Sequence, residues 1–323
     1  MPATVTGGLG TKSPGTPFDA SSTLRSRQLS MITSGPSLDD LRRQIDAIDD
    51  QLHDLLMQRT DLVKEVSRAK QRENTDIVRP GREAAILRRL LGRHRGPFPR
   101  LALARIWREL MTGQVTVQGP FAVAVYTPPE WPGIWDLARD HYGAHPPMTA
   151  YRSIGQVIRA VTDRSATVGI LPVPREGDAD PWWRHLLSRD KTAPRIIARL
   201  PFAGRGNARA VDGDVLAIAA SLPEETGADH SFIVIETKSG ISRTKLMASL
   251  QQIDLGVAML AGWSDAGVTL TLAEIDSYVA ADDPRLTQLA ADLGEPADRI
   301  LVIGGYAIPL TETEQTADAL TVP

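Results

Sequence analysis

The feature that most constrains this chain is an unbroken amphipathic repeat between Leu41 and Ala69. Its apolar positions recur at alternating steps of four and three, which is typical of a helix with one apolar seam: Leu41, Ile45, Ile48, Leu52, Leu55, Leu62, Val66 and Ala69, with Arg59 in the same register. Ser37, with Asp40 three residues later, supplies a capping pattern. We therefore predict one helix of about 36 residues, roughly 54 Å long at 1.5 Å per residue.

Two shorter helices are expected after the long one. Pro80 and the pair Arg82-Glu83 open the first, which continues to about His94. The second begins near Pro99 and ends at Gln118, before a Gly-Pro pair. Two short helices cannot cover the long seam within one chain. We therefore predict an all-α three-helix unit that forms an intertwined homodimer.

Beyond Pro120 the pattern changes to short apolar runs separated by helices and turns. Residues 121–126 and 167–172 are predicted strands around helices at 134–142 and 154–162, a βαβ arrangement. The runs 195–202 and 215–220 are expected to pair as a hairpin.

From Ser231 onward, strand, helix, strand, strand, helix and strand follow in that order, which predicts a ferredoxin-like βαββαβ domain. The fold class is therefore multidomain α and α+β. The expected parts are a disordered tail (1–36), the helical unit (37–120), an α/β region (121–228), the βαββαβ domain (229–312) and a C-terminal tail (313–323).

Composition excludes several classes of protein and site. The chain has no Cys, so it has no disulfide, thiolate zinc site or cysteine nucleophile, and its six His form no helical ligand pair; we expect no metal and no cofactor. No apolar run reaches the roughly 18 to 20 residues of a membrane helix, and no secretory signal begins the chain, so we expect a cytoplasmic protein without a membrane partner. Residues 37–120 hold sixteen Lys and Arg against twelve Asp and Glu, too small a surplus for nucleic-acid binding.

Polar side chains interrupt the apolar seam at positions that suggest a ligand. Arg59 takes a heptad position, and burying an unpaired guanidinium costs several kcal/mol, so either a carboxylate of the bundle or an anionic ligand must meet it. Lys70 follows on nearly the same face, Gln118 ends the stripe of the third helix, and Glu83 points to the same interior. Arg42 of a two-fold partner can join them. Fixed cations, one amide and one carboxylate suit a small dianion with a hydroxyl group.

These residues, in order and spacing, resemble the all-helical chorismate mutases of the shikimate pathway. The resemblance covers about residues 38–118 and lies in these matches: Leu41-Arg42, Ile45, Ile48-Asp49, Leu55-Leu56, Arg59, Val66, Ala69-Lys70, Arg82-Glu83 and Gln118. It implies a dimeric enzyme that rearranges chorismate to prephenate in phenylalanine and tyrosine biosynthesis, by holding the reactive conformer and stabilising charge on the ether oxygen.

The resemblance also implies a role for each matching residue. Arg42 from the partner chain and Arg59 would hold the two substrate carboxylates, Lys70 and Gln118 would bind the ether oxygen, and Glu83 would bind the ring hydroxyl. Arg82 would support the site. Arg79 and Gln114 stand where the family often has Asp and a small hydroxyl residue, and both are candidate hydrogen-bond donors to the substrate.

The rear of the chain is similar to a prephenate dehydratase followed by a regulatory ACT domain, on the runs 168–172, 230–235 and 303–306. The dehydratases carry a Thr-Arg-Phe motif, for which this chain has only His230-Ser231-Phe232, so the resemblance implies a degenerate dehydratase-like region. An aromatic amino-acid effector is a further partner that the ACT-like part implies.

Three alternatives stay open. The chain is a bifunctional mutase and dehydratase, or it is a non-catalytic, metabolite-binding regulatory protein, or its helical bundle is an isochorismate lyase, whose dianionic substrate is closely similar.

Overall fold

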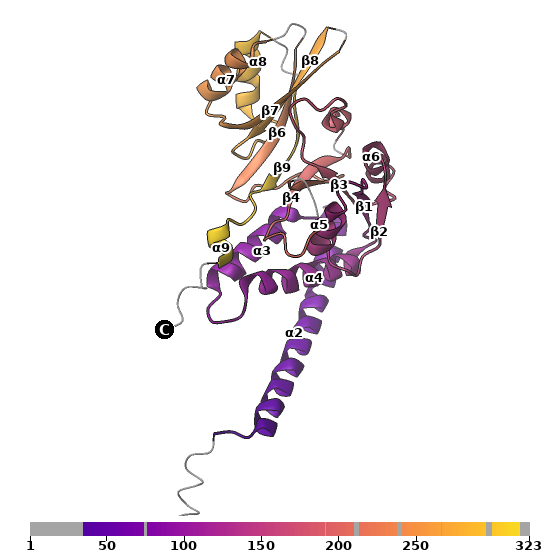
Figure 1. Ribbon diagram of the computed structural model, residues 1–323, viewed down its shortest axis with the longest axis vertical. Coiled ribbons are helices and arrows are strands. Elements are labelled where there is room, and N and C mark those ends of the chain that lie inside the picture. The colour runs from indigo at the N-terminus through magenta and orange to yellow at the C-terminus, as the bar shows by residue number, and fades with distance from the viewer. Residues whose placement is uncertain are drawn as a thin grey trace, which may run out of the picture. The chain divides into compact units, whose positions relative to one another are not determined.

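The computed structural model describes residues 35–73, 76–190, 192–209, 213–237, 241–265, 267–294 and 299–316 (Figure 1). The predicted disordered tail, 1–36, lies outside these residues except for its last two positions, and most of the tail 313–323 also lies outside them. The chain divides between Arg59 and Thr60 into two compact units.

The first unit contains the start of helix α2, which spans Leu38–Glu73 and so confirms the predicted long helix. The capping pattern is realised, because the Asp40 amide donates to Ser37 Oγ at 3.1 Å and the Ser37 amide donates to the Asp40 carboxylate at 3.2 Å. Five seam residues of this unit are exposed by 43% to 59%: Leu41, Ile45, Ile48, Leu52 and Leu55. In the single chain the apolar seam therefore faces solvent.

In the second unit, helices α3 (Pro80–Arg93) and α4 (Arg100–Gln118) follow within about a residue of their predicted bounds. Their shared apolar faces form a small core with two residues of the rear region; its members are Ala84, Leu87, Leu91, Ala104, Met111, Phe202 and Leu310. Arg88 of α3 also donates to the carbonyl of Ile308 at 2.8 Å. These contacts fasten the two shorter helices to the rear of the chain.

The rear region forms one nine-stranded sheet in the order β2-β1-β3-β5-β4-β9-β6-β8-β7 (Figure 1). Its first five strands are β1 (Val123–Tyr126), β2 (Met148–Tyr151), β3 (Val168–Pro172), β4 (Arg195–Leu200) and β5 (Val215–Ala219). Strand β1 pairs in parallel with β2 and β3, and β4 pairs antiparallel with β5, which confirms the predicted hairpin.

Two helices cover opposite faces of this part of the sheet. Helix α5 (Gly133–Tyr142) packs on the face of Val123 and Val125, and helix α6 (Ile154–Thr162) packs on the face of Ala124. Successive strand residues point to opposite faces, so the apolar run of β1 serves both helices.

The remaining elements confirm the ferredoxin-like prediction. They are β6 (Asp229–Thr237), α7 (Arg243–Gln252), β7 (Val257–Asp265), β8 (Val268–Ile275), α8 (Pro284–Leu293) and β9 (Ile300–Ala307), followed by the short helix α9 (Glu312–Thr316). Their strand order, β9-β6-β8-β7, is that of a βαββαβ sheet.

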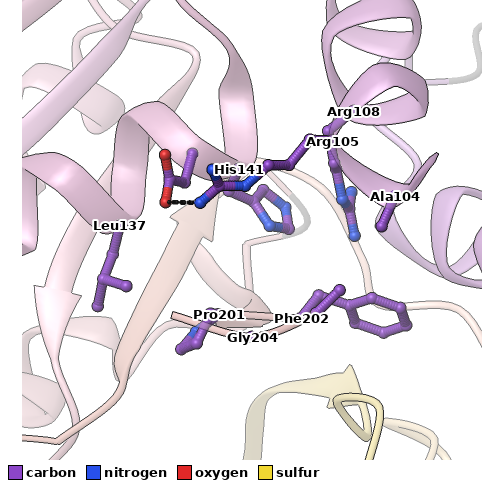
Figure 2. Close-up of a pocket in the computed structure, with 10 residues that line it drawn as sticks. Ala104, Arg105, Arg108, Leu137, His141, Pro201, Phe202 and Gly204 are labelled. Atoms are coloured by element: carbon purple, nitrogen blue, oxygen red, sulfur yellow. Dashed lines mark hydrogen bonds and ion pairs between the residues drawn. The ribbon is translucent and has the colours of Figure 1, made fainter. Parts of the chain in front are cut away.

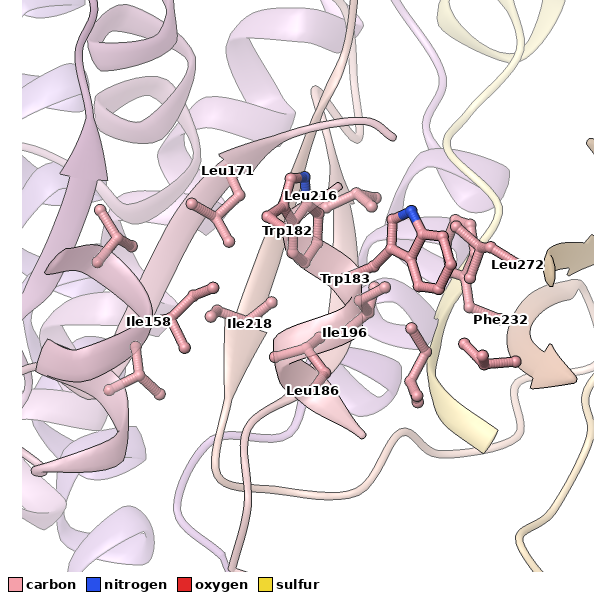
Figure 3. Close-up of a cluster of buried hydrophobic side chains, with 14 of the residues drawn as sticks. Ile158, Leu171, Trp182, Trp183, Leu186, Ile196, Leu216, Ile218, Phe232 and Leu272 are labelled. Atoms are coloured by element: carbon pink, nitrogen blue, oxygen red, sulfur yellow. The ribbon is translucent and has the colours of Figure 1, made fainter. Parts of the chain in front are cut away.

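Strand β9 joins the ferredoxin-like strands to the rest of the sheet. It pairs in parallel with β4 at Ile196 and Gly304, and Gly304 has φ of +137°. A Cβ at Gly304 would lie 2.2 Å from the Ile196 carbonyl oxygen, so only glycine permits this approach. Trp182 and Trp183 of the short helix η1 (Trp182–Leu186) lie in the core shared by both parts, near Ile196 and Phe232 (Figure 3). The α/β region and the βαββαβ domain therefore share one sheet and one core.

Candidate active site

A polar cluster lies where the end of α2 meets the end of α4. Lys70 Nζ donates to the Ile77 carbonyl at 3.1 Å and to Gln118 Oε1 at 3.3 Å. Gln118 Nε2 donates in turn to the Gln114 carbonyl at 3.2 Å. Burial, followed by the nearby Arg79 charge, lowers the pKa of Lys70, against the opposing effect of Glu224. The structure thus brings together Lys70 and Gln118, from two helices.

Glu83 lies in an ion pair inside the helical core. Its carboxylate accepts from Arg108 Nη1 at 2.8 Å, and the side chains are only 20% and 7% exposed. Burial raises the pKa of Glu83, while the charges of Arg108 and Lys70 oppose that rise. Arg108 was not predicted. The signal was its place on the apolar face of α4, four residues after Ala104 and three before Met111.

Gln114 lies one turn before Gln118 on α4, and its side chain contacts α2. It is 5% exposed, and its Nε2 donates to Thr60 Oγ1 at 3.5 Å. Its Oε1 is buried and has no hydrogen-bond partner among the described residues. A buried amide oxygen without a partner is costly, which is typical of a group that meets a ligand.

Arg79 and Arg82, at the start of α3, contact the rear of the chain through Glu224. The Arg79 guanidinium forms an ion pair with Glu224, and the Arg82 amide donates to the same carboxylate at 3.2 Å. Glu224 belongs to the segment between β5 and β6. No local pattern could have indicated Glu224, because the contact joins residues more than a hundred positions apart.

Arg42 and Arg59 belong to the first unit. The Arg42 guanidinium is exposed and lies 3.4 Å from Asp39, and Arg59 is half-buried at the end of that unit.

In the rear region the residues that replace the dehydratase motif lie on β6. Ser231 is 1% exposed, and its Oγ accepts from the Val279 amide at 2.8 Å, while Phe232 is buried in the core. His230 Nδ1 lies 3.0 Å from Glu274 Oε1 and 3.2 Å from Tyr306 Oη. Each of the three side chains thus has a partner within the fold.

Arg199 of β4 supplies a guanidinium beside these residues that the sequence did not indicate. Its Nη1 donates to Tyr306 Oη at 2.9 Å and to Glu274 Oε1 at 3.3 Å, and its Nε donates to Asp214 at 2.9 Å. Burial opposes ionisation of Glu274, but the hydrogen bonds from His230 and Tyr306 and the charge of Arg199 lower its pKa on balance.

A small cavity lies between α4, α5 and the segment after β4 (Figure 2). Its volume is about 20 Å³, room for little more than a water molecule. Arg108, His141 and Phe202 line it, and burial followed by the Arg108 charge holds the pKa of His141 well below its usual value. This junction is packed structure and no substrate pocket.

Neither a membrane-spanning helix nor a metal-ligand cluster occurs in the described part of the chain. No helix there is long and apolar enough to cross a membrane. The same residues contain no group of three His, Cys, Asp or Glu side chains placed to hold a metal ion.

Comparison with known proteins gives a family for the helical region. The family described as chorismate mutase type II matches residues 41–119. The bifunctional chorismate mutase/prephenate dehydratase of Stutzerimonas stutzeri is 29% identical over 147 residues, which cover 44% of this chain and 40% of that protein. The enzyme of the same description from Pseudomonas aeruginosa is 30% identical over 41% of this chain and 38% of its own length. The match therefore spans about two fifths of these relatives.

Among solved structures, prephenate dehydratase from Streptococcus mutans aligns with a TM-score of 0.42 at 12% identity, covering 58% of this chain and 98% of that one. Prephenate dehydratase from Arthrobacter aurescens, in complex with L-Phe, aligns with a TM-score of 0.43 at 12% identity, covering 61% and 95%. The family match confirms the resemblance that the sequence motifs indicated: the segment from Leu41 to Gly119 matches the type II chorismate mutases.

Proposed function

We propose that the helical region of this chain rearranges chorismate to prephenate. The observation that carries the proposal is the contact of Lys70 with Gln118, 3.3 Å apart, within the segment that matches the chorismate mutase family. Lys70 comes from α2 and Gln118 from α4, so the fold of the unit itself creates the pair.

The reaction needs no nucleophile, proton transfer or cofactor. Within one substrate molecule the ether C–O bond breaks as a C–C bond forms, and negative charge develops on the ether oxygen. Lys70 has three N–H donors, two of which are used in the structure, and the Gln118 amide can turn to donate as well. Removing one preorganised donor to an oxyanion typically costs about 3 to 4 kcal/mol, so each of the two should affect the rate strongly.

The other candidate residues are assigned to substrate binding. Arg59 and Arg42 of the partner chain bind the two carboxylates, and Glu83 binds the ring hydroxyl from its fixed position beside Arg108. Arg82 supports the site, and Arg79 and Gln114 supply secondary hydrogen bonds. The buried Gln114 oxygen, which has no partner among the described residues, accepts hydrogen bonds only, so within the substrate it can meet only the hydroxyl group.

A homodimer is part of the proposal, because the resemblance to the chorismate mutases assigns Arg42 of a second chain to the site. The exposure of Leu41, Ile45 and Ile48, between 43% and 56%, supports it. Burying an aliphatic side chain of this size contributes about 1.5 to 3 kcal/mol. A second copy of α2 is the simplest cover for such a seam.

The rear region is assigned a supporting role without dehydratase activity. Dehydration of prephenate calls for a positioned hydroxyl donor and a guanidinium near the departing groups. Ser231 is 1% exposed and already bonded to Val279, and His230 stands where the family has threonine. One observation favours the bifunctional alternative: Arg199 places a guanidinium 2.9 Å from Tyr306 Oη, beside His230. The curated relatives that match this chain carry both activities in their names.

An aromatic amino-acid effector for the ACT-like domain stays a prediction. Ser242 precedes α7 in this domain, and its Oγ accepts from the Lys245 amide at 3.2 Å as the cap of that helix. Ser242 therefore stabilises the start of α7.

The test is to feed the purified full chain chorismate, prephenate and isochorismate separately near neutral pH and to identify each product by chromatography. Prephenate from chorismate, with nothing formed enzymatically from the other two, is the expected result. Enzyme-dependent phenylpyruvate would establish the bifunctional alternative, and cleavage of isochorismate would establish the lyase. A folded chain inactive on all three substrates would leave the non-catalytic alternative.

A further inference from the structure

A second cavity lies away from the candidate active site, at the junction of β4, β9 and the loop before α8. Its volume is about 210 Å³. Ser188, Arg195, Pro223, Tyr278, Ile300 and Val302 are among its lining residues. The wall is thus mostly apolar, with Ser188, Arg189, Arg195 and Tyr278 as its polar side chains, which is the usual composition of a small-molecule site.

Arg195 gives this cavity a buried positive charge. The residue is 6% exposed, and Nη1 donates to the carbonyl of Pro194 at 3.2 Å while Nη2 donates to that of Asp190 at 3.2 Å. Nη1 also donates to the Leu186 carbonyl, and Nη2 also donates to the Ser188 carbonyl. Ser188 is itself a lining residue.

No described carboxylate forms an ion pair with this guanidinium. The acid whose charge acts on it is Asp190, which accepts from the Thr192 amide at 2.8 Å and the Thr192 hydroxyl at 2.9 Å through Oδ1. Burial outweighs the Asp190 charge and lowers the pKa of Arg195, so that charge compensates the guanidinium only in part. A buried cation with incomplete compensation is costly, and an anion in the cavity would add to the compensation.

We propose that this cavity binds a small monocarboxylate with an apolar body, its carboxylate toward Arg195 and its body against Ile300 and Val302. The volume sets the size of the ligand, since an apolar cavity of about 150 Å³ accommodates benzene. A cavity of about 210 Å³ therefore fits a benzene-sized body with one carboxylate attached.

The cavity is connected to the start of α3 through one short segment. Tyr278 Oη donates to the Pro223 carbonyl at 3.5 Å, and both residues line the cavity. The next residue, Glu224, holds the Arg79 guanidinium and the Arg82 amide. An occupant that packs against Tyr278 and Pro223 stabilises Glu224 in this position and so keeps Arg79 from the substrate. This step rests on the proposed function: the occupant raises the KM for chorismate.

Binding is tested first, by calorimetric titration of the full chain with three probes. Benzoate carries both charge and body, benzamide keeps the body without the charge, and acetate keeps the charge without the body. We expect benzoate to bind with a Kd of about 1 mM or tighter, at least tenfold tighter than either other probe. Absence of benzoate binding, or equal binding of benzamide, would overturn the site.

Variants locate the binding. Arg195→Leu should abolish benzoate binding, but Arg195 also anchors the carbonyls of residues 186–190, so this variant is paired with Ala280→Phe, which fills the cavity and keeps the arginine. Arg243→Leu is the matched control, because Arg243 is an exposed arginine paired with Glu176 outside the cavity. Wild-type benzoate binding by Ala280→Phe would place the ligand elsewhere and overturn the proposal.

The coupling is tested by chorismate kinetics with and without benzoate. We expect saturating benzoate to raise the KM at least twofold with little change in kcat. The effect of benzoate on the KM should disappear in Ala280→Phe, and this loss would exclude direct competition at the mutase site. It should also disappear in Glu224→Gln, although this variant should still bind benzoate. An unchanged KM in an active enzyme would disprove the coupling. A chain without chorismate turnover would disprove the proposed function, while calorimetry still decides the binding site.

Discussion

Lys70 is the residue on which the proposed chemistry depends most, and its surroundings make its charge sensitive to pH. Burial lowers its pKa from 10.5, so the side chain loses its proton at lower pH than a free lysine. The same shift affects folding stability. Between the lowered pKa and 10.5 the unfolded chain binds more protons at Lys70 than the folded chain does. The Lys70 contribution to the free energy of unfolding therefore rises with pH in this range, whereas that of a lysine in a salt bridge falls.

We predict an alkaline limb in the pH profile of kcat/KM, with an apparent pKa below 10.5, because neutral Lys70 cannot stabilise the ether oxygen. Lys70→Arg should keep part of the activity and lack this limb, since arginine stays protonated in this range. Initial rates with chorismate at constant ionic strength measure the profile. The same limb in Lys70→Arg would assign the titration to another group.

The pair of Glu83 and Arg108 is expected to matter for stability as well as for the site. We predict that Arg108→Leu destabilises the chain by about 3 to 5 kcal/mol, because it leaves a buried carboxylate without its partner. Urea unfolding measures the loss. Arg105→Leu is the control, since Arg105 pairs with Asp140 at 2.7 Å but is 44% exposed, and such pairs contribute about 1 kcal/mol or less. Equal losses in the two variants would contradict the account of the buried pair.

At the scale of elements, periodicity decided what could be predicted from sequence. The bounds of α2 were predictable because its repeat runs without interruption, and the βαββαβ order was predictable because its strands carry apolar runs between the two helical segments. Strand β2 was missed because it lies at the sheet edge with its central residues exposed, so it lacks an apolar pattern. Glu224 and Arg199 act through partners distant in sequence, which a local pattern cannot show.

For helix α2 we predict that Leu52→Glu converts a dimer into a monomer, because Leu52 lies on the apolar seam and is 54% exposed in the single chain. Light scattering after size-exclusion chromatography measures the mass. The control is Gln51→Glu, which adds the same charge at the neighbouring exposed position off the seam. A wild-type chain that is monomeric at micromolar concentration would contradict the predicted pairing of seams.

At the scale of the whole molecule, we predict that each site is shared by two chains. A chain with Arg42→Ala and a chain with Lys70→Ala should each be inactive alone. Mixed in equal amounts, they should recover about a quarter of the wild-type rate, because half of the dimers are hybrids and each hybrid has one intact site of two. Lack of recovery after subunit exchange has been demonstrated would place Arg42 outside the shared site.

The rear region is connected to helix α3 by polar contacts. The Arg79 guanidinium and the Arg82 amide both contact Glu224. The Arg88 guanidinium donates to the Ile308 carbonyl. Helix α3, which carries Glu83, is therefore bound to segments that adjoin the strands of the sheet.

The most direct measurement of the central claim is the rate at which the purified full chain forms prephenate from chorismate. The account predicts turnover by the wild type and a loss of at least about 100-fold in kcat/KM for Lys70→Ala. It predicts near-wild-type rates for Lys64→Ala, since Lys64 lies on the same helix, is 53% exposed and pairs with Asp61 at 3.0 Å. A folded wild-type chain without turnover, or a Lys70→Ala chain as fast as the wild type, would contradict it.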